Sequence, residues 1–166
     1  MEKIWKSRIA RKIKIRFFQA CVESILLYGS ETWTVSAELK ARIDGCYTRL
    51  LRRALNIRWQ DHPTNQMVYQ DLPKLSDKLK ERRLRYAGHC ARAEDQPVNQ
   101  LLFWTPHLGN PSRGQPRLTY PKTLKNDTGL ENPEEILELM RNKETWSTFV
   151  LSNSYLSTDD PPMGVR

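Results

Sequence analysis

A set of basic side chains at helical spacing is the feature of this sequence best suited to chemistry, namely the binding of phosphate. Intervals of four, three, four and three residues place five side chains on one helix face: Lys78, Arg82, Arg85, His89 and Arg92. We call these five residues the 78–92 ridge. No acidic residue belongs to the ridge, which favours contact with a phosphate backbone. The alternative is an ordinary solvated charged face.

A second arginine-rich helix is predicted over residues 37–56. Arg42, Arg49 and Arg53 share one of its sides. The guanidinium group is a planar fork of hydrogen-bond donors that matches a phosphate. Two such helices in one chain are a more specific indication of nucleic-acid binding than either helix alone.

The stretch "SRGQPR", residues 112–117, is a basic turn that contains Gly and Pro. Its backbone amides and the side chains of Arg113 and Arg117 are suited to hold one phosphate. It is not a P-loop, because the required Gly, Lys and Ser/Thr spacing and the following helix are missing. The turn is therefore either a linker contact to nucleic acid or a plain connection.

Catalytic groups are not indicated. In "SILLYGSETWTV", residues 24–35, Glu31 lies between two aromatic residues, but helical periodicity flanks the stretch on both sides. The stretch therefore predicts a turn in which Trp33 packs down. The adjacent aspartates of "STDDPP", residues 157–162, are followed by two prolines, whereas polymerase aspartates need a rigid hairpin. We predict that the chain is not an enzyme.

The cysteine and histidine residues are scattered. Cys21, Cys46 and Cys90 form no C-x-x-C pair, and the adjacent His89 and Cys90 point to different sides of a helix. We therefore predict no metal site, no cofactor and no small-molecule substrate. An odd number of thiols without a disulfide framework indicates a reducing compartment, the nucleus or the cytoplasm.

The charge is unevenly distributed along the chain. Lys and Arg outnumber Asp and Glu by 13 to 5 over residues 1–60 and by 11 to 6 over residues 61–126, whereas residues 127–166 have 3 against 8. A concentrated positive field favours a polyanion such as RNA or DNA, with an anionic membrane surface as the less favoured alternative. No segment has the roughly 18 apolar residues that span a bilayer, and no membrane partner is predicted.

Hydrophobic periodicity predicts an all-α chain, with helices over residues 4–28, 37–56, 64–70, 74–93, 98–103, 120–127 and 133–150. The stripes expected to face the core are Ile9, Ile13, Phe17, Cys21 and Ile25 in the first helix and Leu39, Ile43, Tyr47, Leu50 and Ala54 in the second. These elements predict an irregular helical bundle with a long Pro/Gly-rich loop and a disordered acidic C-terminal tail.

Three motifs follow one another in an order found in a known family. The run "LLYGSETW", the helix "RRLRYAGHCAR" and the Gly/Pro/Arg turn resemble the region after the polymerase palm of non-long-terminal-repeat retrotransposon reverse transcriptases. The resemblance runs from about Trp5 to at least Thr128, and more weakly through "MRNKETWSTFV". It departs at Gln115, where the family usually has Arg, and at Pro121, where the family tends to continue a helix.

The resemblance implies four segments: a thumb-like helical segment over 1–60, a basic helix with a Pro/Gly-rich linker over 61–128, a C-terminal helix over 129–151 and a disordered tail over 152–166. The family's palm and endonuclease lie upstream, and neither fits in this chain. The resemblance thus implies a non-catalytic remnant whose basic helix faces contact the phosphates of RNA or an RNA/DNA hybrid. The alternatives are an interaction protein that docks an acidic partner, and a retroelement fragment without function.

Overall fold

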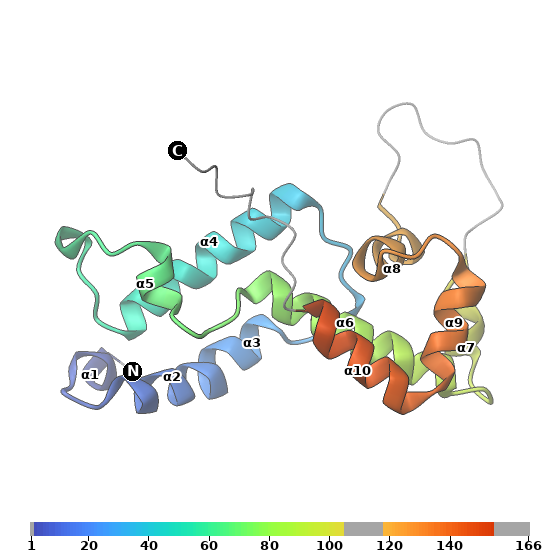
Figure 1. The fold of residues 1–166 in the computed structure, drawn as a ribbon. Coiled ribbons are helices and arrows are strands. Elements are labelled where there is room, and N and C mark those ends of the chain that lie inside the picture. The colour runs from blue at the N-terminus through green and yellow to red at the C-terminus, as the bar shows by residue number, and fades with distance from the viewer. Residues whose placement is uncertain (1, 105–117, 155–166) are drawn as a thin grey trace. The chain divides into compact units, whose positions relative to one another are not determined.

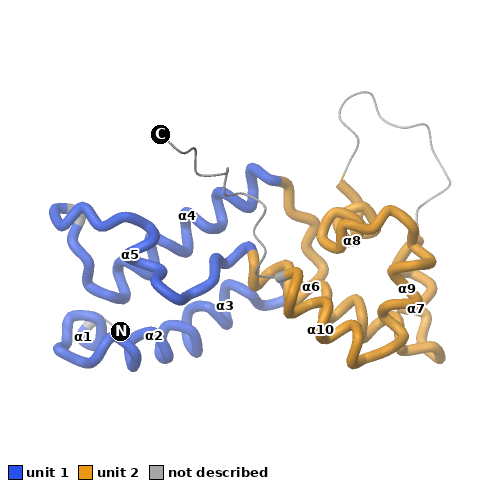
Figure 2. Tube along the Cα trace, viewed as in Figure 1, with its two compact units in different colours: residues 1–30, 37–76 blue, residues 31–36, 77–166 orange. Residues whose placement is uncertain are grey.

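The computed structural model describes residues 2–104 and 118–154. Within these ranges the backbone forms helices and turns without a strand, which confirms the predicted all-α class (Figure 1). The chain divides into two compact units, residues 1–30 with 37–76 and residues 31–36 with 77–166 (Figure 2). We call them unit 1 and unit 2. The predicted Pro/Gly-rich loop over 105–117 and the tail beyond Ser154 lie outside the described residues.

Unit 1 contains the long helix α4 (Ala37–Ala54), a helical segment from Arg11 to Leu26 and several shorter helices and turns. Its elements are α1 (Glu2–Lys6), α2 (Arg11–Phe18), a π-helical turn (Gln19–Glu23), α3 (Ser24–Leu26), α4, a 3-10 turn (Trp59–Asp61) and α5 (Asn65–Tyr69). The helices predicted over 37–56 and 64–70 are confirmed. The single helix predicted over 4–28 is wrong near its start, because the backbone turns extended at Ala10, with φ −54° and ψ 139°.

The core of unit 1 is centred on Tyr47 of α4, whose side chain is fully buried. The ring of Phe18 meets it edge-on, with centroids 5.4 Å apart, and the ring of Tyr69 lies at 6.0 Å. The Tyr47 hydroxyl donates a hydrogen bond of 2.8 Å to Oε2 of Glu23, so the polar tip of a buried aromatic has a partner. The other buried apolar residues of unit 1 are Trp5, Leu27, Leu51, Ala54, Val68 and Leu75.

The apolar stripe predicted for the first helix is wrong in its register. Ile13 is 57% exposed and Ile25 is 73% exposed, whereas Phe18 and Leu27 are buried. The buried face of α2 contains Lys14 and Phe18 and not Ile13. The physical reason is that steps of four residues drift around an α-helix of 3.6 residues per turn, so a strict four-residue count does not follow one buried face.

The stripe predicted for the second helix is correct in part. Tyr47 and Ala54 are buried as predicted, but Leu51 takes the place of Leu50 in the core. Leu39 is 41% exposed, and Ala37 and Glu38 beside it in the first turn of α4 are exposed too.

Side chains of unit 1 hold the ends of neighbouring helices. The Asp44 carboxylate accepts hydrogen bonds from the backbone N–H of Ser76 at 2.9 Å and from its Oγ at 2.7 Å, in the first turn of α6 (Leu75–Arg92). A carboxylate at a helix N-terminus satisfies free N–H groups and complements the helix dipole. At the end of α5, Nη2 of Arg11 donates to the carbonyl of Val68 at 2.7 Å.

Unit 2 contains the remainder of α6, followed by α7 (Pro97–Leu101), α8 (Tyr120–Thr128), α9 (Pro133–Arg141) and α10 (Lys143–Ser154). The helices predicted over 74–93 and 120–127 are confirmed, and Pro121 lies in the first turn of α8, where a missing N–H costs nothing. The single helix predicted over 133–150 is divided at Asn142. Its Oδ1 accepts from the backbone N–H of Glu144 at 3.0 Å and starts α10.

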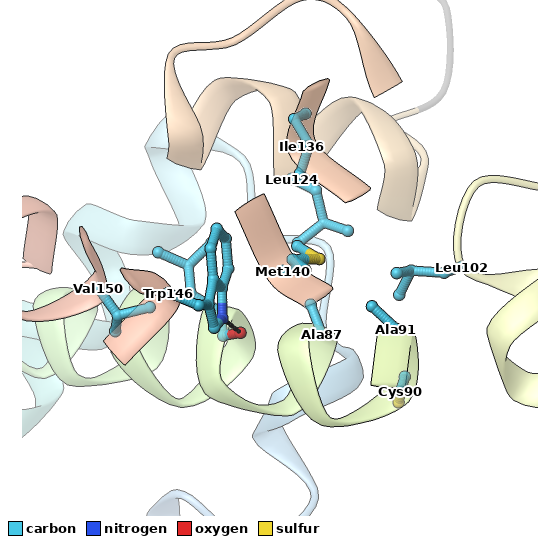
Figure 3. Close-up of a cluster of buried hydrophobic side chains, with 10 residues drawn as sticks. Ala87, Cys90, Ala91, Leu102, Leu124, Ile136, Met140, Trp146 and Val150 are labelled. Atoms are coloured by element: carbon cyan, nitrogen blue, oxygen red, sulfur yellow. Dashed lines mark hydrogen bonds between the residues drawn. The ribbon is translucent and has the colours of Figure 1, made fainter. Parts of the chain in front are cut away.

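The core of unit 2 forms where α10 crosses α6 (Figure 3). The indole of Trp146 lies against α6 at Gly88, and its Nε1 donates to the carbonyl of Leu84 at 2.9 Å. In an α-helix that carbonyl also accepts from the amide four residues later, which is that of Gly88. A Cβ on Gly88 would collide with Nε1 and Cδ1 of Trp146. The buried apolar side chains around this contact are Leu84, Ala87, Cys90, Ala91, Leu102, Leu124, Ile136, Met140 and Val150.

Replacing Gly88 by Ala is expected to destabilise unit 2 by about 1–3 kcal/mol, because the new methyl group overpacks the contact with Trp146. Denaturant unfolding followed by tryptophan fluorescence measures this change. Gly45→Ala in α4 is the matched control, since nothing lies within 4 Å of the added Cβ. That variant should gain roughly 0.5–1 kcal/mol from helix propensity. Equal effects of the two substitutions would contradict this account.

Alkaline pH is expected to destabilise unit 1 through Tyr47. Its pKa is raised above the ordinary tyrosine value, first by burial and then by the hydrogen bond to Glu23. Above about pH 10 the unfolded chain has therefore lost a proton that the folded chain keeps, and stability falls by up to about 1.4 kcal/mol per pH unit. Urea unfolding at increasing pH should show this slope in the wild type and a shallower one in Tyr47→Phe. Identical slopes would rule out Tyr47 as the source.

Candidate nucleic-acid interface

The net positive charge of the chain belongs to unit 1. Residues 1–30 and 37–76 contain 14 Lys and Arg against 6 Asp and Glu, a net charge of +8. Residues 31–36 and 77–166 contain 13 of each kind, a net charge of zero. Attraction of a polyanion depends on uncompensated charge, so unit 1 is the main source of any such attraction.

The arginines predicted on α4 lie at the surface of unit 1. Arg42, Arg49 and Arg53 are exposed, and their spacing of seven and four residues places them on one side of the helix. Arg42 and Arg49 form no ion pair or hydrogen bond through their side chains with any described residue. The neighbouring Arg52 is different, because its Nη2 donates to the carbonyl of Pro63 at 3.0 Å and to Oδ1 of Asn65 at 2.9 Å.

Arg82 of the 78–92 ridge is held by the turn that follows α3. Its Nε lies 2.9 Å and its Nη2 2.6 Å from Oε1 of Glu31. Through this ion pair, Glu31 connects the 3-10 turn Ser30–Thr32 to α6. The expectation that Trp33 packs down is wrong, because its side chain is 40% exposed. The contact that ties this turn to α6 is the Glu31–Arg82 ion pair.

Two further arginines of the ridge have partners in unit 2. Arg85 pairs with Glu81 one turn earlier, with Nε and Nη2 both 2.8 Å from Oε1. An exposed pair of this kind contributes only about 0.3–0.5 kcal/mol, so it is easily exchanged. Arg92 donates from Nη1 to the carbonyl of Met140 at 2.7 Å, in the last turn of α9, where a cation complements the helix dipole.

For the remaining predicted site residues the structure gives at most the exposure of the side chain. Lys78 is half-buried and has interactions of its own, and His89 is exposed. Arg113 and Arg117 lie outside the described residues. The structure therefore brings the predicted residues together as two groups on α4 and α6, one in each unit.

Sequence reasoning did not single out Arg83, which forms a buried ion pair with Asp127 of α8. The two side chains are 1% and 3% exposed, and Nη1 of Arg83 contacts Oδ2 of Asp127. Asn153 of α10 donates to the backbone carbonyl of Asp127 at 2.9 Å, so three helices meet at this pair. Close by, burial raises the pKa of Tyr120 above its ordinary value, against the opposing effect of Arg83.

Sequence reasoning also passed over two exposed cations of α2, Lys12 and Arg16. The signal that could have found them is compositional. Seven Lys and Arg and no Asp or Glu occur over residues 3–22.

Two further properties concern only the part of the chain that the structure describes. No three His, Cys, Asp or Glu side chains gather there in a way that could hold a metal ion. Within residues 2–104 and 118–154, no helix is both long enough and apolar enough to cross a membrane.

Comparison with known proteins finds a relative among mobile-element proteins. Over 103 residues the chain is 30% identical to an uncharacterized transposon-derived protein of Caenorhabditis elegans, F52C9.6. The chain is distantly homologous to a transposon-derived protein. The match covers 58% of this chain and 37% of the relative, so the chain spans little more than a third of the relative's length. Neither a protein-family model nor a solved structure matches the chain.

Breaking the buried pair by Asp127→Ala is expected to destabilise unit 2 by about 3–5 kcal/mol, because the Arg83 guanidinium stays buried without a counter-charge. The double variant Arg83→Met with Asp127→Leu should recover most of the loss, since it removes both charges. Arg85→Ala, which removes the exposed member of the Arg85–Glu81 pair, is the surface control, with an expected cost of less than about 0.5 kcal/mol. Thermal unfolding measures all three. A double variant as unstable as Asp127→Ala would show that shape and not charge dominates here.

Proposed function

We propose that this chain is a non-catalytic nucleic-acid-binding segment derived from a non-long-terminal-repeat retrotransposon reverse transcriptase. Three findings support the proposal. The motif order resembles the region after the palm of that family, and the chain is homologous to a transposon-derived protein. The observation that carries the binding role is the net charge of +8 in unit 1, with Arg42 and Arg49 exposed and unpaired among the described residues.

The proposed contacts are made by guanidinium groups on phosphate oxygens. Arg42, Arg49 and Arg53 lie along one side of α4, and each offers a fork of donors to the backbone of a nucleic acid. Binding would release the cations condensed on the phosphates, which is an entropic gain that decreases with salt. Contacts to phosphate carry no sequence information, so we expect weak sequence preference.

The 78–92 ridge would contribute less than α4. A phosphate that approaches Arg82 has to displace the Glu31 carboxylate, and Arg92 is committed to the end of α9. Arg85 is the exception, because its exposed pair with Glu81 is weak. The ridge is therefore proposed as a secondary contact and α4 as the primary one.

As a binding segment the chain makes and breaks no covalent bond. Its proposed chemistry is the exchange of phosphate counterions for protein cations, and this exchange needs neither a metal ion nor a cofactor of the chain's own.

We expect fluorescence anisotropy with labelled single-stranded RNA and DNA to show affinity that falls linearly with salt on a log–log scale. Each neutralised phosphate contributes about −0.7 to the slope. Replacing Arg42 and Arg49 by Ala should make the slope shallower by about 1.4, and replacing Arg82 and Arg85 by Ala should change it less. Arg141→Ala with Lys143→Ala removes the same charge from exposed positions of unit 2 and is the matched control.

Absence of binding by the folded protein at low salt would exclude the proposed function. Tight binding to acidic polypeptides such as polyglutamate, with none to RNA or DNA, would favour an interaction protein that docks an acidic partner. Aggregation or loss of helical signal in the purified chain would indicate a retroelement fragment without function.

A further inference from the structure

Unit 1 has a second basic surface, which lies on α2 and α3 and not on α4. The backbone stays helical from Arg11 to Leu26 through α2, the π-helical turn and α3. Exposed residues recur along it about once in every four: the adjacent Lys12 and Ile13, then Arg16, Ala20 and the adjacent Ser24 and Ile25, with Tyr28 just beyond its end. We call these seven residues the α2–α3 stripe.

The π-helical turn keeps this stripe on one face. Steps of four residues drift around an α-helix of 3.6 residues per turn. A π-helical turn contains more residues, so four residues fall short of a full turn and part of the drift is reversed. At 1.5 Å per residue the distance from Lys12 to Tyr28 is roughly 24 Å, which several nucleotides of an extended strand can cover.

The basic side chains of this segment fall into two groups, one directed into unit 1 and one directed to solvent. Arg11 and Lys14 point inward, where backbone carbonyls receive them: that of Val68 accepts from Arg11 and that of Trp5 from Lys14, both at 2.7 Å. Lys12 and Arg16 point outward and have no ion-pair partner among the described residues. Residues 3–22 contain no Asp or Glu, and Glu23, the one carboxylate between Arg11 and Leu26, accepts the hydrogen bond of Tyr47.

Apolar side chains share the stripe with these cations: Ile13 lies between Lys12 and Arg16, and Ile25 and Tyr28 follow them. Ile13 is 57%, Ile25 is 73% and Tyr28 is 86% exposed. A single exposed apolar residue is ordinary, but a stripe that mixes them with unpaired cations fits a partner with both anionic and apolar parts. A single-stranded nucleic acid has both, because its unstacked bases present apolar faces beside the phosphates. A duplex keeps those faces inside its stack.

We infer that the α2–α3 stripe binds single-stranded nucleic acid, with Lys12 and Arg16 on phosphates and Tyr28 stacked on a base beside Ile25. This inference rests on the proposed function and deepens it by naming the form of the strand. It adds Lys12, Arg16 and Tyr28 to the contacts proposed on α4. On this inference the basic side chains of the stripe bind phosphates, and its apolar side chains contact bases.

The test compares one labelled oligonucleotide as a single strand and as a duplex, bound to the full chain and measured by anisotropy across a salt series. We expect tighter binding of the single strand. Tyr28→Ala should weaken that binding by at least about fivefold, without changing the salt slope or the duplex affinity. Lys12→Ala with Arg16→Ala should make the single-strand slope shallower by about 1.4.

Tyr28→Phe is the matched control, because it keeps the ring that stacks and should retain the wild-type affinity. Since Tyr28 is 86% exposed, neither substitution at this position removes a core contact. Arg141→Ala with Lys143→Ala controls for the loss of two charges and should leave the preference for single strands intact.

Several results would overturn the inference. Equal losses on single strand and duplex would leave only phosphate contacts, and an unaffected Tyr28→Ala would remove the stacking. A stripe variant that changes the sedimentation of the protein but not its binding would assign the stripe to a second copy of the chain. Binding that depends on Arg42 and Arg49 alone would contradict this inference while the proposed function stands. Absence of any binding by folded wild-type protein would exclude both.

Discussion

The arrangement of unit 2 depends on the contact between the indole of Trp146 and the bare backbone of α6 at Gly88. Because Gly88 has no side chain, the ring reaches the carbonyl of Leu84 and forms a hydrogen bond there. Ala87 and Ala91 of α6 are buried in the same core as Trp146 (Figure 3). The small residues of the motif "RRLRYAGHCAR" are thus explained by packing.

The basic side chains of the two units differ in whether an acidic partner offsets their charge. Inside unit 2 three arginines of α6 are compensated: Arg83 by Asp127, Arg82 by Glu31 and Arg85 by Glu81. The buried pair is held by geometry, since leaving either charge alone in the core would be costly. Unit 1 has a net charge of +8 and keeps exposed cations on α2 and α4. A count of basic residues along the sequence gives these three arginines of α6 and the cations of α2 and α4 equal weight. The structure distinguishes them, because the three arginines of α6 have acidic partners.

Periodicity and helix-ending residues were sufficient to predict most helices, because both are local properties. They missed the extended backbone at Ala10, the π-helical turn and the division at Asn142, each of which requires a local geometry that an apolar repeat does not encode. For the candidate site, the exposure of Arg42 and Arg49 followed from their positions on an amphipathic helix. The partners of Arg82 and Arg92 did not, because Glu31 and Met140 lie 51 and 48 residues away in sequence. Such pairings arise from tertiary packing, which the spacing of charges along one helix cannot reveal.

The chain passes from one unit to the other after Ser30, after Ser36 and after Ser76. Neither unit is therefore a continuous piece of sequence, since residues 31–36 belong to unit 2 although unit 1 flanks them on both sides. A truncation that removes α6 and everything after it would leave Glu31 without Arg82, and a deletion of the first half would take Glu31 away from α6. The Glu31–Arg82 ion pair of unit 2 therefore needs both the segment before α4 and helix α6 in the same chain.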